Sequence, residues 1–414
     1  MTQRNHRQPR PLEPPLTDVK YGEEITLLPD AEAAEYVALI HRQIRSHRER
    51  FRIPVIGIAG TEGKTTTKRM LSAILSPVMR VLETEPYCAT THGVTSTLVK
   101  LDDSYDAAIL ELGIIKPDQF RLAVDIARPT IGVITNIGES HLAAEGDKYL
   151  IADAKVDLIR NLPASGYAVL NIDDDLVSGM AKFSTTPRII KFGFNKNAQF
   201  YASRIRYLGP DGIRFLVNGH YDLHLPVFGS TAIYNALTAI AIARVLNIDF
   251  DVIQEGLATR FSMPEHSGNL LREKDLNILD YTYDATINSV TKACESLVQF
   301  KPFARKLILA IGDISNPGPD PEGTHLKMGY YIAAMPIDMV VTVGPNARLI
   351  GEGIQRINHT RKRLDHCADG DHLVETLAGI CEPGDALLVI GSRDLRLNGA
   401  LTHFRRKVLS AVAG

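Results

Sequence analysis

The sequence contains no tryptophan and only four cysteines among its 414 residues. The cysteines are Cys88, Cys294, Cys367 and Cys381, and no two of them form a Cys-x-x-Cys pair. This spacing argues against a zinc ribbon or a disulfide framework and favours reduced thiols in a cytoplasm.

Long apolar runs are missing as well. No run reaches the roughly 18 residues that a transmembrane helix needs. The N-terminus is basic but lacks the apolar stretch of a signal peptide. The sequence therefore predicts a soluble cytoplasmic protein without a membrane partner.

Neither sign of charge is in large excess, since the formal net charge is −2. No overall basic field would recruit nucleic acid or an anionic membrane. Hydrophobic residues make up 45% of the chain and charged residues 23%, as in ordinary globular proteins. The length predicts two or three domains.

A phosphate-binding loop is the strongest local signal. An apolar, β-branched run from Val55 breaks at Gly60, passes through Gly63, Lys64 and Thr65, and enters a helical pattern. In this strand–turn–helix context the glycines let backbone amides approach phosphate, and the helix N-terminus adds positive charge. The lysine would reach the β- and γ-phosphates, and the threonine hydroxyl would hold Mg²⁺. The expected loop residues are Gly60, Thr61, Gly63, Lys64, Thr65 and Thr66.

One departure shortens the motif. The general pattern has a glycine five residues before Gly63, where this chain has Ile58. The alternative, a tight turn with no ligand, does not explain a lysine at the mouth of the helix.

Strands and helices alternate from residue 52 onward, which predicts a mostly parallel sheet covered by helices. Before this region we expect a disordered arm up to about Pro29 and an amphipathic helix over 31–50, whose arginines form a solvated face. The predicted strands are 55–59, 107–113, 130–135 and 167–171, and the predicted helices are 68–75, 120–127, 151–162 and 231–246.

Residues 189–227 show short alternating runs and polar turns, which predict a β-rich insertion or a small antiparallel sheet. The aperiodic segment 261–268 predicts a domain boundary. After it, strands at 277–281, 306–311, 339–343 and 386–390 predict a second, doubly wound (Rossmann-like) domain. The predicted fold is α/β, divided into an N-terminal arm and helix (1–50), a central ATP-binding domain (51–262) and a C-terminal domain (263–414).

Three polar side chains lie where open parallel sheets bind ligands. Glu111 ends a strand, where an acid commonly holds Mg²⁺, and His141 follows the next strand. A histidine there is as compatible with a structural role as with a ligand. Lys155 lies between two acids on a predicted helix, and alone it would be interpreted as a surface ion pair.

Taken together, these motifs resemble the Mur ligase superfamily, whose members join a carboxylate to an amine with ATP. The first-domain motifs are Gly60-Thr61-x-Gly63-Lys64-Thr65-Thr66, Leu110-Glu111-Leu112-Gly113, Thr135-Asn136-Ile137-Gly138-x-x-His141-Leu142 and Ala154-Lys155. In the second domain, Asp280 to Ser289 is similar to Asp-Asp-Ser-Tyr-Asn-Ala-Asn-Pro-x-Ser. Ile311-Gly312-Asp313, His325, Gly329 and Gly391-Ser392-Arg393 resemble the D-Ala-D-Ala-adding branch. The resemblance covers about residues 51–393.

The resemblance implies a role for each matching residue. Lys64 and the loop amides would bind the ATP phosphates, and Thr65 and Glu111 would hold one of two Mg²⁺ ions. His141 would serve the second ion together with Lys155, the lysine that is carbamylated in this family. Asn235, Asp280, Tyr283 and Asp284 would contact the nucleotide. The substrate carboxylate would form an acyl-phosphate, which a small-molecule amine then attacks.

Other positions depart from the family. Only about 50 residues precede the loop, where Mur members carry a UDP-sugar-binding domain. The asparagine-rich segment before Gly-Val-Pro is replaced by residues 87–95, His-Asn-x-x-Asn retains only Asn235, and Gly-Arg becomes Gly268-Asn269. Tyr281 and Asp284 replace an aspartate and an asparagine.

Two hypotheses follow from this pattern. The first is an ATP-dependent carboxylate–amine ligase with a substrate other than ordinary UDP-MurNAc-tripeptide. The second is a nucleotide-binding homologue with little or no ligase activity, acting as a regulator or scaffold. An unrelated P-loop kinase or GTPase fits less well, because it leaves the second α/β domain unexplained. The sequence does not determine the oligomeric state.

Overall fold

A computed structural model describes residues 30–410 apart from residues 87, 114–115, 139–147 and 358–361. The predicted N-terminal arm and His141 lie outside the described residues. No described helix combines the length and the apolar character needed to cross a membrane.

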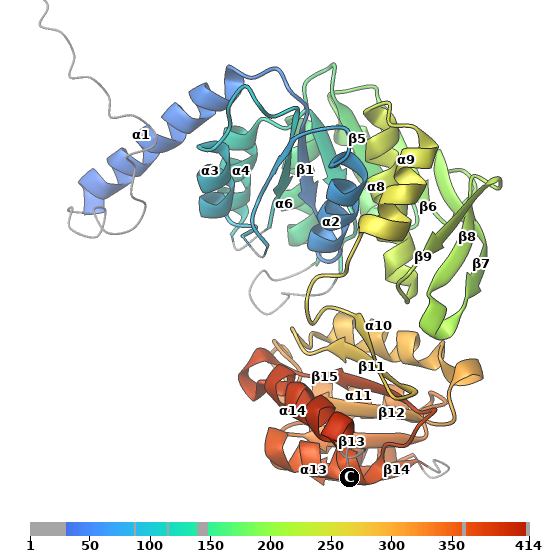
Figure 1. Cartoon of the computed structure of the whole chain (residues 1–414). Helices are drawn as coiled ribbons and strands as arrows, with labels where there is room; N and C mark the ends of the chain where they lie inside the picture. Colours follow the sequence, from blue (N-terminus) through green and yellow to red (C-terminus); the bar gives the residue numbers. More distant parts are fainter. Residues whose placement is uncertain (1–29, 87, 114–115, 139–147, 358–361, 411–414) are drawn as a thin grey trace, which may run out of the picture.

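The first sheet has nine strands in the order β2-β3-β1-β4-β5-β6-β7-β8-β9 (Figure 1). Neighbouring strands are parallel from β2 to β7, and β8 and β9 add an antiparallel hairpin. The antiparallel strands predicted within 189–227 are thus present, and they extend the main sheet. The strands are β1 (Val55–Ala59), β2 (Val81–Glu83), β3 (Ala107–Glu111), β4 (Ile131–Ile134), β5 (Tyr167–Asn171), β6 (Ile189–Gly193), β7 (Phe200–Tyr207), β8 (Ile213–Val217) and β9 (Tyr221–Leu225).

Helices cover both faces of this sheet because its central strands are buried on both sides. In β1, Ile56 and Ile58 pack toward α2, α8 and α9, whereas Val55 and Ala59 pack toward α1, α3, α4 and α6. The helices are α1 (Asp30–Glu49), α2 (Lys64–Leu75), α3 (Thr91–Leu98), α4 (Pro117–Ala127), α6 (Lys148–Arg160), α7 (Asp175–Gly179), α8 (Ser230–Val245) and α9 (Phe250–Glu255).

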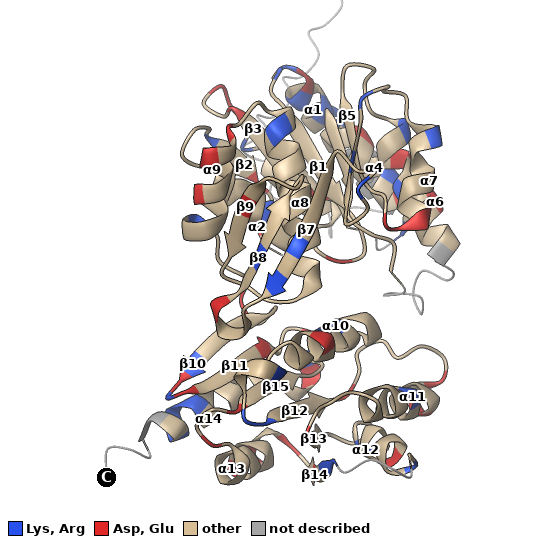
Figure 2. Cartoon of the chain, turned by 90° about the vertical axis from the view of Figure 1, so that its right-hand side faces the viewer, with Lys and Arg blue, Asp and Glu red and all other residues tan. Residues whose placement is uncertain are grey.

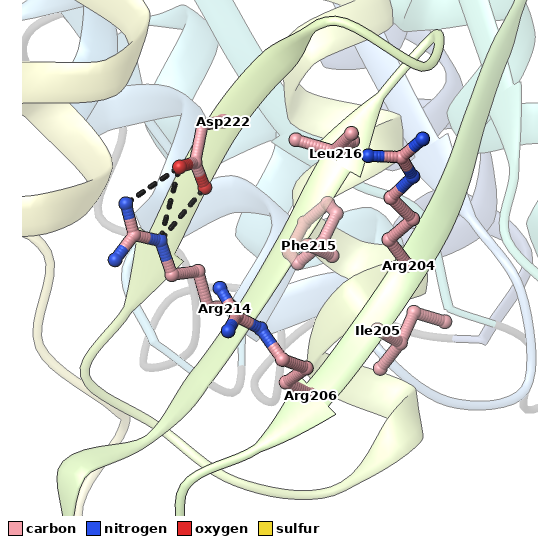
Figure 3. Close-up of a pocket in the computed structure, with 7 residues that line it drawn as sticks. All are labelled: Arg204, Ile205, Arg206, Arg214, Phe215, Leu216 and Asp222. Carbon is pink, nitrogen blue, oxygen red and sulfur yellow. Dashed lines mark hydrogen bonds and ion pairs between the residues drawn. The ribbon is translucent and has the colours of Figure 1, made fainter.

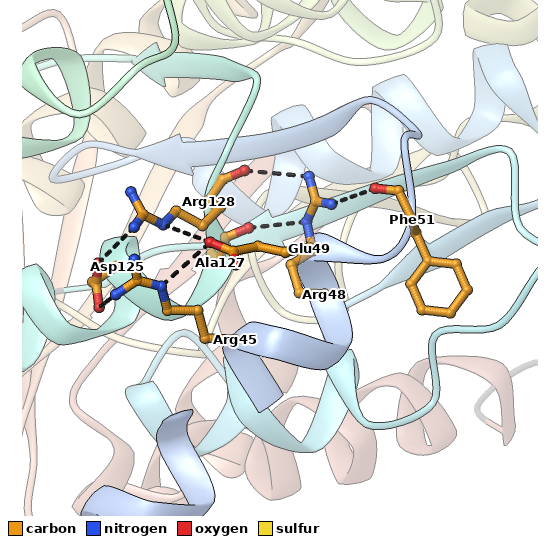
Figure 4. Close-up of polar contacts among 7 residues, drawn as sticks. All are labelled: Arg45, Arg48, Glu49, Phe51, Asp125, Ala127 and Arg128. Atoms are coloured by element: carbon orange, nitrogen blue, oxygen red, sulfur yellow. Dashed lines mark hydrogen bonds and ion pairs between the residues drawn. The ribbon is translucent and has the colours of Figure 1, made fainter. Parts of the chain in front are cut away.

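A buried arginine, Arg48, attaches helix α1 to the C-terminal end of α4 (Figure 4). Arg48 is 4% exposed and donates to the carbonyl oxygens of Phe51, Ala127 and Arg128, at 2.7, 3.1 and 3.2 Å. The last carbonyls of α4 have no partner within the helix, and the guanidinium supplies one. The prediction that the α1 arginines form a solvated face is therefore wrong for Arg48, although Arg42 is exposed.

The outer face of the β7–β9 extension is basic (Figure 3). Arg206 faces Arg214 directly across the β7–β8 pair, beside a hollow of about 490 Å³. Arg214 forms a bidentate pair with Asp222 on β9, with bonds between 2.6 and 3.0 Å.

The second sheet has the order β10-β11-β15-β12-β13-β14, parallel except for the edge strand β10. This is the predicted doubly wound arrangement, with α10, α11 and α12 on one face and α13 and α14 on the other. The strands are β10 (Asn269–Glu273), β11 (Leu276–Tyr281), β12 (Leu307–Gly312), β13 (Met339–Val343), β14 (Arg363–Cys367) and β15 (Ala386–Ile390). The helices are α10 (Ile287–Val298), α11 (Pro321–Ala333), α12 (Arg348–Gln355), α13 (Gly370–Ile380) and α14 (Leu397–Ser410).

Helix α10 lies between the two sheets (Figures 1 and 2). Near its start, Asn288 Nδ2 would lie 3.1 Å from a Cβ atom placed on Gly138. Beyond its end, Phe303 contacts Gly209 in the β7–β8 turn. Between these points, the Gln299 side-chain oxygen accepts from the backbone N–H of Gly229 at 3.3 Å. The start of α10 therefore lies close to the loop after β4.

Candidate active site

The predicted phosphate loop joins β1 to α2 in a left-handed turn. Gly60 has φ +145° and Gly63 has φ +83°, conformations that L side chains rarely adopt. Helix α2 begins at Lys64, directly after Gly63, and its backbone N–H groups therefore face the loop. Thr61 is buried in this turn, and Thr66 lies half-buried in the first helical turn.

The Lys64 side chain folds back over the loop. Its Nζ donates to the carbonyl oxygens of Gly60 and Thr61, at 2.9 and 3.1 Å. The ammonium is thereby held at the N-terminal end of α2, where charge and dipole both favour an anion.

The loop after β4 supports the phosphate loop through hydrogen bonds. Asn136 accepts from the backbone N–H of Glu62 at 3.0 Å and donates to its carbonyl at 3.1 Å. Thr61 N donates to Asn136 O, and Thr61 Oγ1 accepts from Gly138 N at 2.9 Å. These residues belong to a motif in the sequence, but their support of the phosphate loop was not predicted.

Asn235, predicted as a nucleotide contact, lies on α8 beneath the phosphate loop. It is 4% exposed, and its Oδ1 accepts from Thr67 Oγ1 at 3.4 Å. A Cβ atom on Gly63 would come within 2.3 Å of the same oxygen. In the described geometry the Asn235 side chain therefore supports the turn.

The structure brings Glu111 and Thr65, the two predicted ligands of one Mg²⁺, together. Glu111 ends β3 opposite Ile58 of β1, so its carboxylate lies at the edge of the sheet where α2 starts. Thr65 Oγ1 donates to Glu111 Oε2 at 2.8 Å.

A residue that sequence analysis missed completes this cluster. Lys68, one turn beyond Lys64 on α2, is 1% exposed, and its Nζ lies 2.9 Å from Glu111 Oε1. It also donates to the carbonyl of Thr84. Among the described residues, Glu111 Oε1 accepts no hydrogen bond and faces this charge alone. A lysine four residues after the phosphate-loop lysine, on the same helical face, was the available signal.

The Thr65–Glu111 pair fits one Mg²⁺ ion, because a hydroxyl and a carboxylate are oxygen donors that this ion prefers. Within the described part of the chain, no three His, Cys, Asp or Glu side chains form a metal cluster. Further donors would be phosphate oxygens and water, as is usual for Mg²⁺ at nucleotides.

Lys155 lies on α6 and is 3% exposed, so it is not the surface residue that its acidic neighbours suggested. Its neighbour Asp157 accepts from Arg121 at 2.5 Å and from Arg160 at 3.2 Å. The proposed partner of Lys155 at a second metal, His141, lies outside the described residues.

The predicted residues of the second domain cluster at the C-terminal end of β11 and directly after it. Asp280 is 4% exposed, and its Oδ1 accepts from the N–H and the hydroxyl of Thr282, at 3.0 and 2.7 Å. Its Oδ2 lies 2.8 Å from His266 Nδ1. Asp284 accepts from the next backbone N–H at 2.9 Å, and the Arg393 guanidinium lies 4.2 Å from the centre of the Tyr283 ring.

Tyr281 and His325 lie at positions of the family motifs, and both make contacts that support the second domain. Tyr281 bonds weakly to Ser296, and burial raises its pKa to about 12, so it is neutral where the family has an aspartate. His325 is 1% exposed: Nε2 accepts from Ile314 N at 3.0 Å and Nδ1 donates to Pro321 O at 2.7 Å. With both ring nitrogens bonded, this histidine connects α11 to the loop after β12.

The chain matches two family descriptions, the Mur ligase middle domain over residues 58–243 and the Mur ligase, glutamate ligase domain over residues 269–393. It therefore belongs to the Mur ligase family. Within that family it is a MurF-like, ATP-dependent ligase.

Two relatives illustrate the similarity. The UDP-N-acetylmuramoyl-tripeptide–D-alanyl-D-alanine ligase of a Synechocystis species is 30% identical over 360 residues, which are 86% of this chain and 75% of the relative. The enzyme of the same name from Escherichia coli is 29% identical over 300 residues, 72% of this chain and 66% of the relative.

Solved structures agree on the fold. MurF from Acinetobacter baumannii superposes with a TM-score of 0.80 at 24% identity, covering 89% of this chain and 80% of that one. MurF ligase from Thermotoga maritima, in complex with ADP, gives 0.79 at 21% identity, covering 91% and 85%.

Proposed function

We propose that the chain activates a small-molecule carboxylate as an acyl-phosphate and passes the acyl group to an amine. A carboxylate oxygen attacks the γ-phosphorus of ATP and ADP leaves. The amine nitrogen then attacks the acyl carbon, loses a proton, and phosphate departs. The observation that carries this proposal is the Thr65–Glu111 pair, 2.8 Å apart at the N-terminus of α2 and one residue from Lys64.

The residues have distinct proposed roles. Lys64 and the amides at the start of α2 bind phosphate, and Asp280, Tyr283 and Asp284 contact the nucleotide from the second domain. Thr65 Oγ1 and Glu111 Oε2 would hold one Mg²⁺, which when bound neutralises phosphate charge. A carbamylated Lys155, with His141, would hold a second. The match of Ala154-Lys155 to the family motif supports this assignment.

The carboxylate substrate is proposed to differ from UDP-MurNAc-tripeptide. Residues 88–95 of the segment that departs from the family lie near Glu111. Gly113 N, two residues after Glu111, donates to Ala89 O at 2.7 Å, and α3 begins at Thr91. We propose that the altered side chains of this segment contact the acid that is activated.

The test is nucleotide turnover. Purified protein with ATP and Mg²⁺ should release ADP and phosphate in the presence of a carboxylate and an amine other than UDP-MurNAc-tripeptide and D-Ala-D-Ala. Turnover with that standard pair at the highest rate of a broad panel would contradict the altered substrate. Background rates with every pair would contradict the ligase.

A nucleotide-binding homologue with little ligase activity is the second candidate. It is favoured by Tyr281, whose neutral, buried ring replaces an acid near the nucleotide residues. Tight binding of ATP and Mg²⁺ without turnover would support it. The domain limits of 1–50, 51–262 and 263–414 also remain our proposal, as does a cytoplasmic location.

A further inference from the structure

The Lys68–Glu111 pair is buried more deeply than any other ion pair between described residues. The side chains are 2% and 1% exposed, and the Nζ–Oε1 distance is 2.9 Å. Around Lys68, α2 presents apolar side chains such as Met70 and Leu71 to the core.

A buried ion pair is a poor way to stabilise this core. Removing two charges from water costs several kcal/mol per ion, and apolar side chains of similar volume often stabilise a protein as well or better. The pair therefore calls for another explanation than stability.

The two carboxylate oxygens of Glu111 have different partners. Oε1 faces the Lys68 ammonium, whereas Oε2 accepts from Thr65 Oγ1. Thr84 fixes both partners, because its carbonyl accepts from Lys68 Nζ and its hydroxyl accepts from Glu111 N at 3.0 Å. Glu111 Oε2 therefore faces the phosphate loop at the start of α2. The Lys68–Glu111 pair as a whole has no net charge.

We propose that Lys68 is a positioning residue that turns Glu111 Oε2 toward the nucleotide's metal ion and makes metal binding depend on nucleotide phosphate. This inference rests on the proposed metal site at Thr65 and Glu111. With the carboxylate neutralised by Lys68, a divalent cation finds little attraction until phosphate oxygens supply negative charge. A metal ion held by Thr65 and Glu111 would then bind and dissociate together with the nucleotide.

The experiment measures Mn²⁺ binding by electron paramagnetic resonance, without nucleotide and at one pH for all variants. Methionine is unbranched and similar in length to lysine. Lys68→Met should therefore bind Mn²⁺ at least about tenfold more tightly than the wild type. Lys68→Arg, which keeps the charge, should bind as weakly as the wild type.

The matched control is Lys100→Met. Lys100 pairs with Glu85 at 3.2 Å, but both side chains are mostly exposed, so Mn²⁺ binding should not change. A folded Lys68→Met protein with wild-type Mn²⁺ affinity would overturn the proposal. If that variant does not fold, the wild type decides: Mn²⁺ affinity that is equal with and without ADP overturns the proposal, and affinity that ADP raises at least about tenfold supports it. Absence of Mn²⁺ binding in the wild type even with ADP would instead overturn the metal site itself.

Discussion

A Cβ atom on Gly63 would lie 2.3 Å from Asn235 Oδ1, well inside van der Waals contact. Gly63 is in the phosphate loop, and Asn235 is on α8, 172 residues later in the chain. The shape of the loop therefore depends on a helix that reaches it only after the β7–β9 extension.

Replacing Gly63 by alanine should weaken ADP binding at least about tenfold, measured by calorimetry. The added Cβ meets Asn235, and the loop must move away from the geometry that binds phosphate. Gly318→Ala is the control, because Gly318 has φ +85° but nothing within 4 Å of its Cβ position. Asn235→Ala in the Gly63→Ala background should recover part of the affinity. Normal ADP binding by Gly63→Ala alone would refute this account.

Lys155→Ala should abolish turnover while ADP still binds, because the proposed carbamate acts at the second metal. A short carboxylate such as formate should restore part of the rate. Carbon-13-labelled bicarbonate should give a carbamate signal in the wild type that is lost in the variant. Lys182→Ala, at an exposed site, serves as the control. Full activity of Lys155→Ala would remove this lysine from the mechanism.

Arg206→Gln should stabilise the protein at low salt, raising Tm by about 1 °C. Arg206 stands directly opposite Arg214, and like charges at such positions repel. At high salt the gain should vanish through screening. Arg214→Gln should have the opposite sign, since it removes the bidentate pair with Asp222. Equal effects of salt on the wild type and Arg206→Gln would contradict the repulsion.

Stability should fall in alkaline solution because of buried thiols. Burial raises the pKa of Cys294 from 9.0 to about 12. Between pH 9.0 and about 12 the unfolded chain loses the Cys294 thiol proton and the folded chain keeps it. The free energy of unfolding therefore falls as the pH rises. Urea unfolding at pH 8, 9 and 10 should show this decline. Cys294→Ala should have a smaller slope, whereas Cys88→Ala, at a half-exposed site, should match the wild type.

The sequence predicted β5, β13 and β15 to the residue. These strands are short apolar runs with polar or turn residues on either side, buried inside their sheets. It missed β2, β10 and β14. β2 has three residues, and β10 and β14 are edge strands with mixed side chains such as Arg-Leu-Asp-His-Cys. An edge strand need not be apolar on both faces, so its sequence lacks the continuous apolar run that identifies a buried strand.

The site was predictable where chemistry lies within one motif. The glycines, Lys64 and Thr65 follow each other in the chain, and Glu111 ends a predicted strand. Pairing of Lys68 with Glu111 depends instead on the register of β1 against β3, which no local pattern encodes. Arg48 was misjudged for a similar reason, because its partners are carbonyl oxygens, which every residue type carries.

The contacts of α10 constrain how the second domain can swing. The helix has 12 residues, about 18 Å at 1.5 Å per residue. Asn288 near its start contacts the loop after β4, Gln299 bonds to Gly229, and Phe303 past its end abuts the β7–β8 turn. A movement of the second domain that carries Asp280, Tyr283 and Asp284 relative to the phosphate loop would therefore also have to shift or rearrange these contacts along α10.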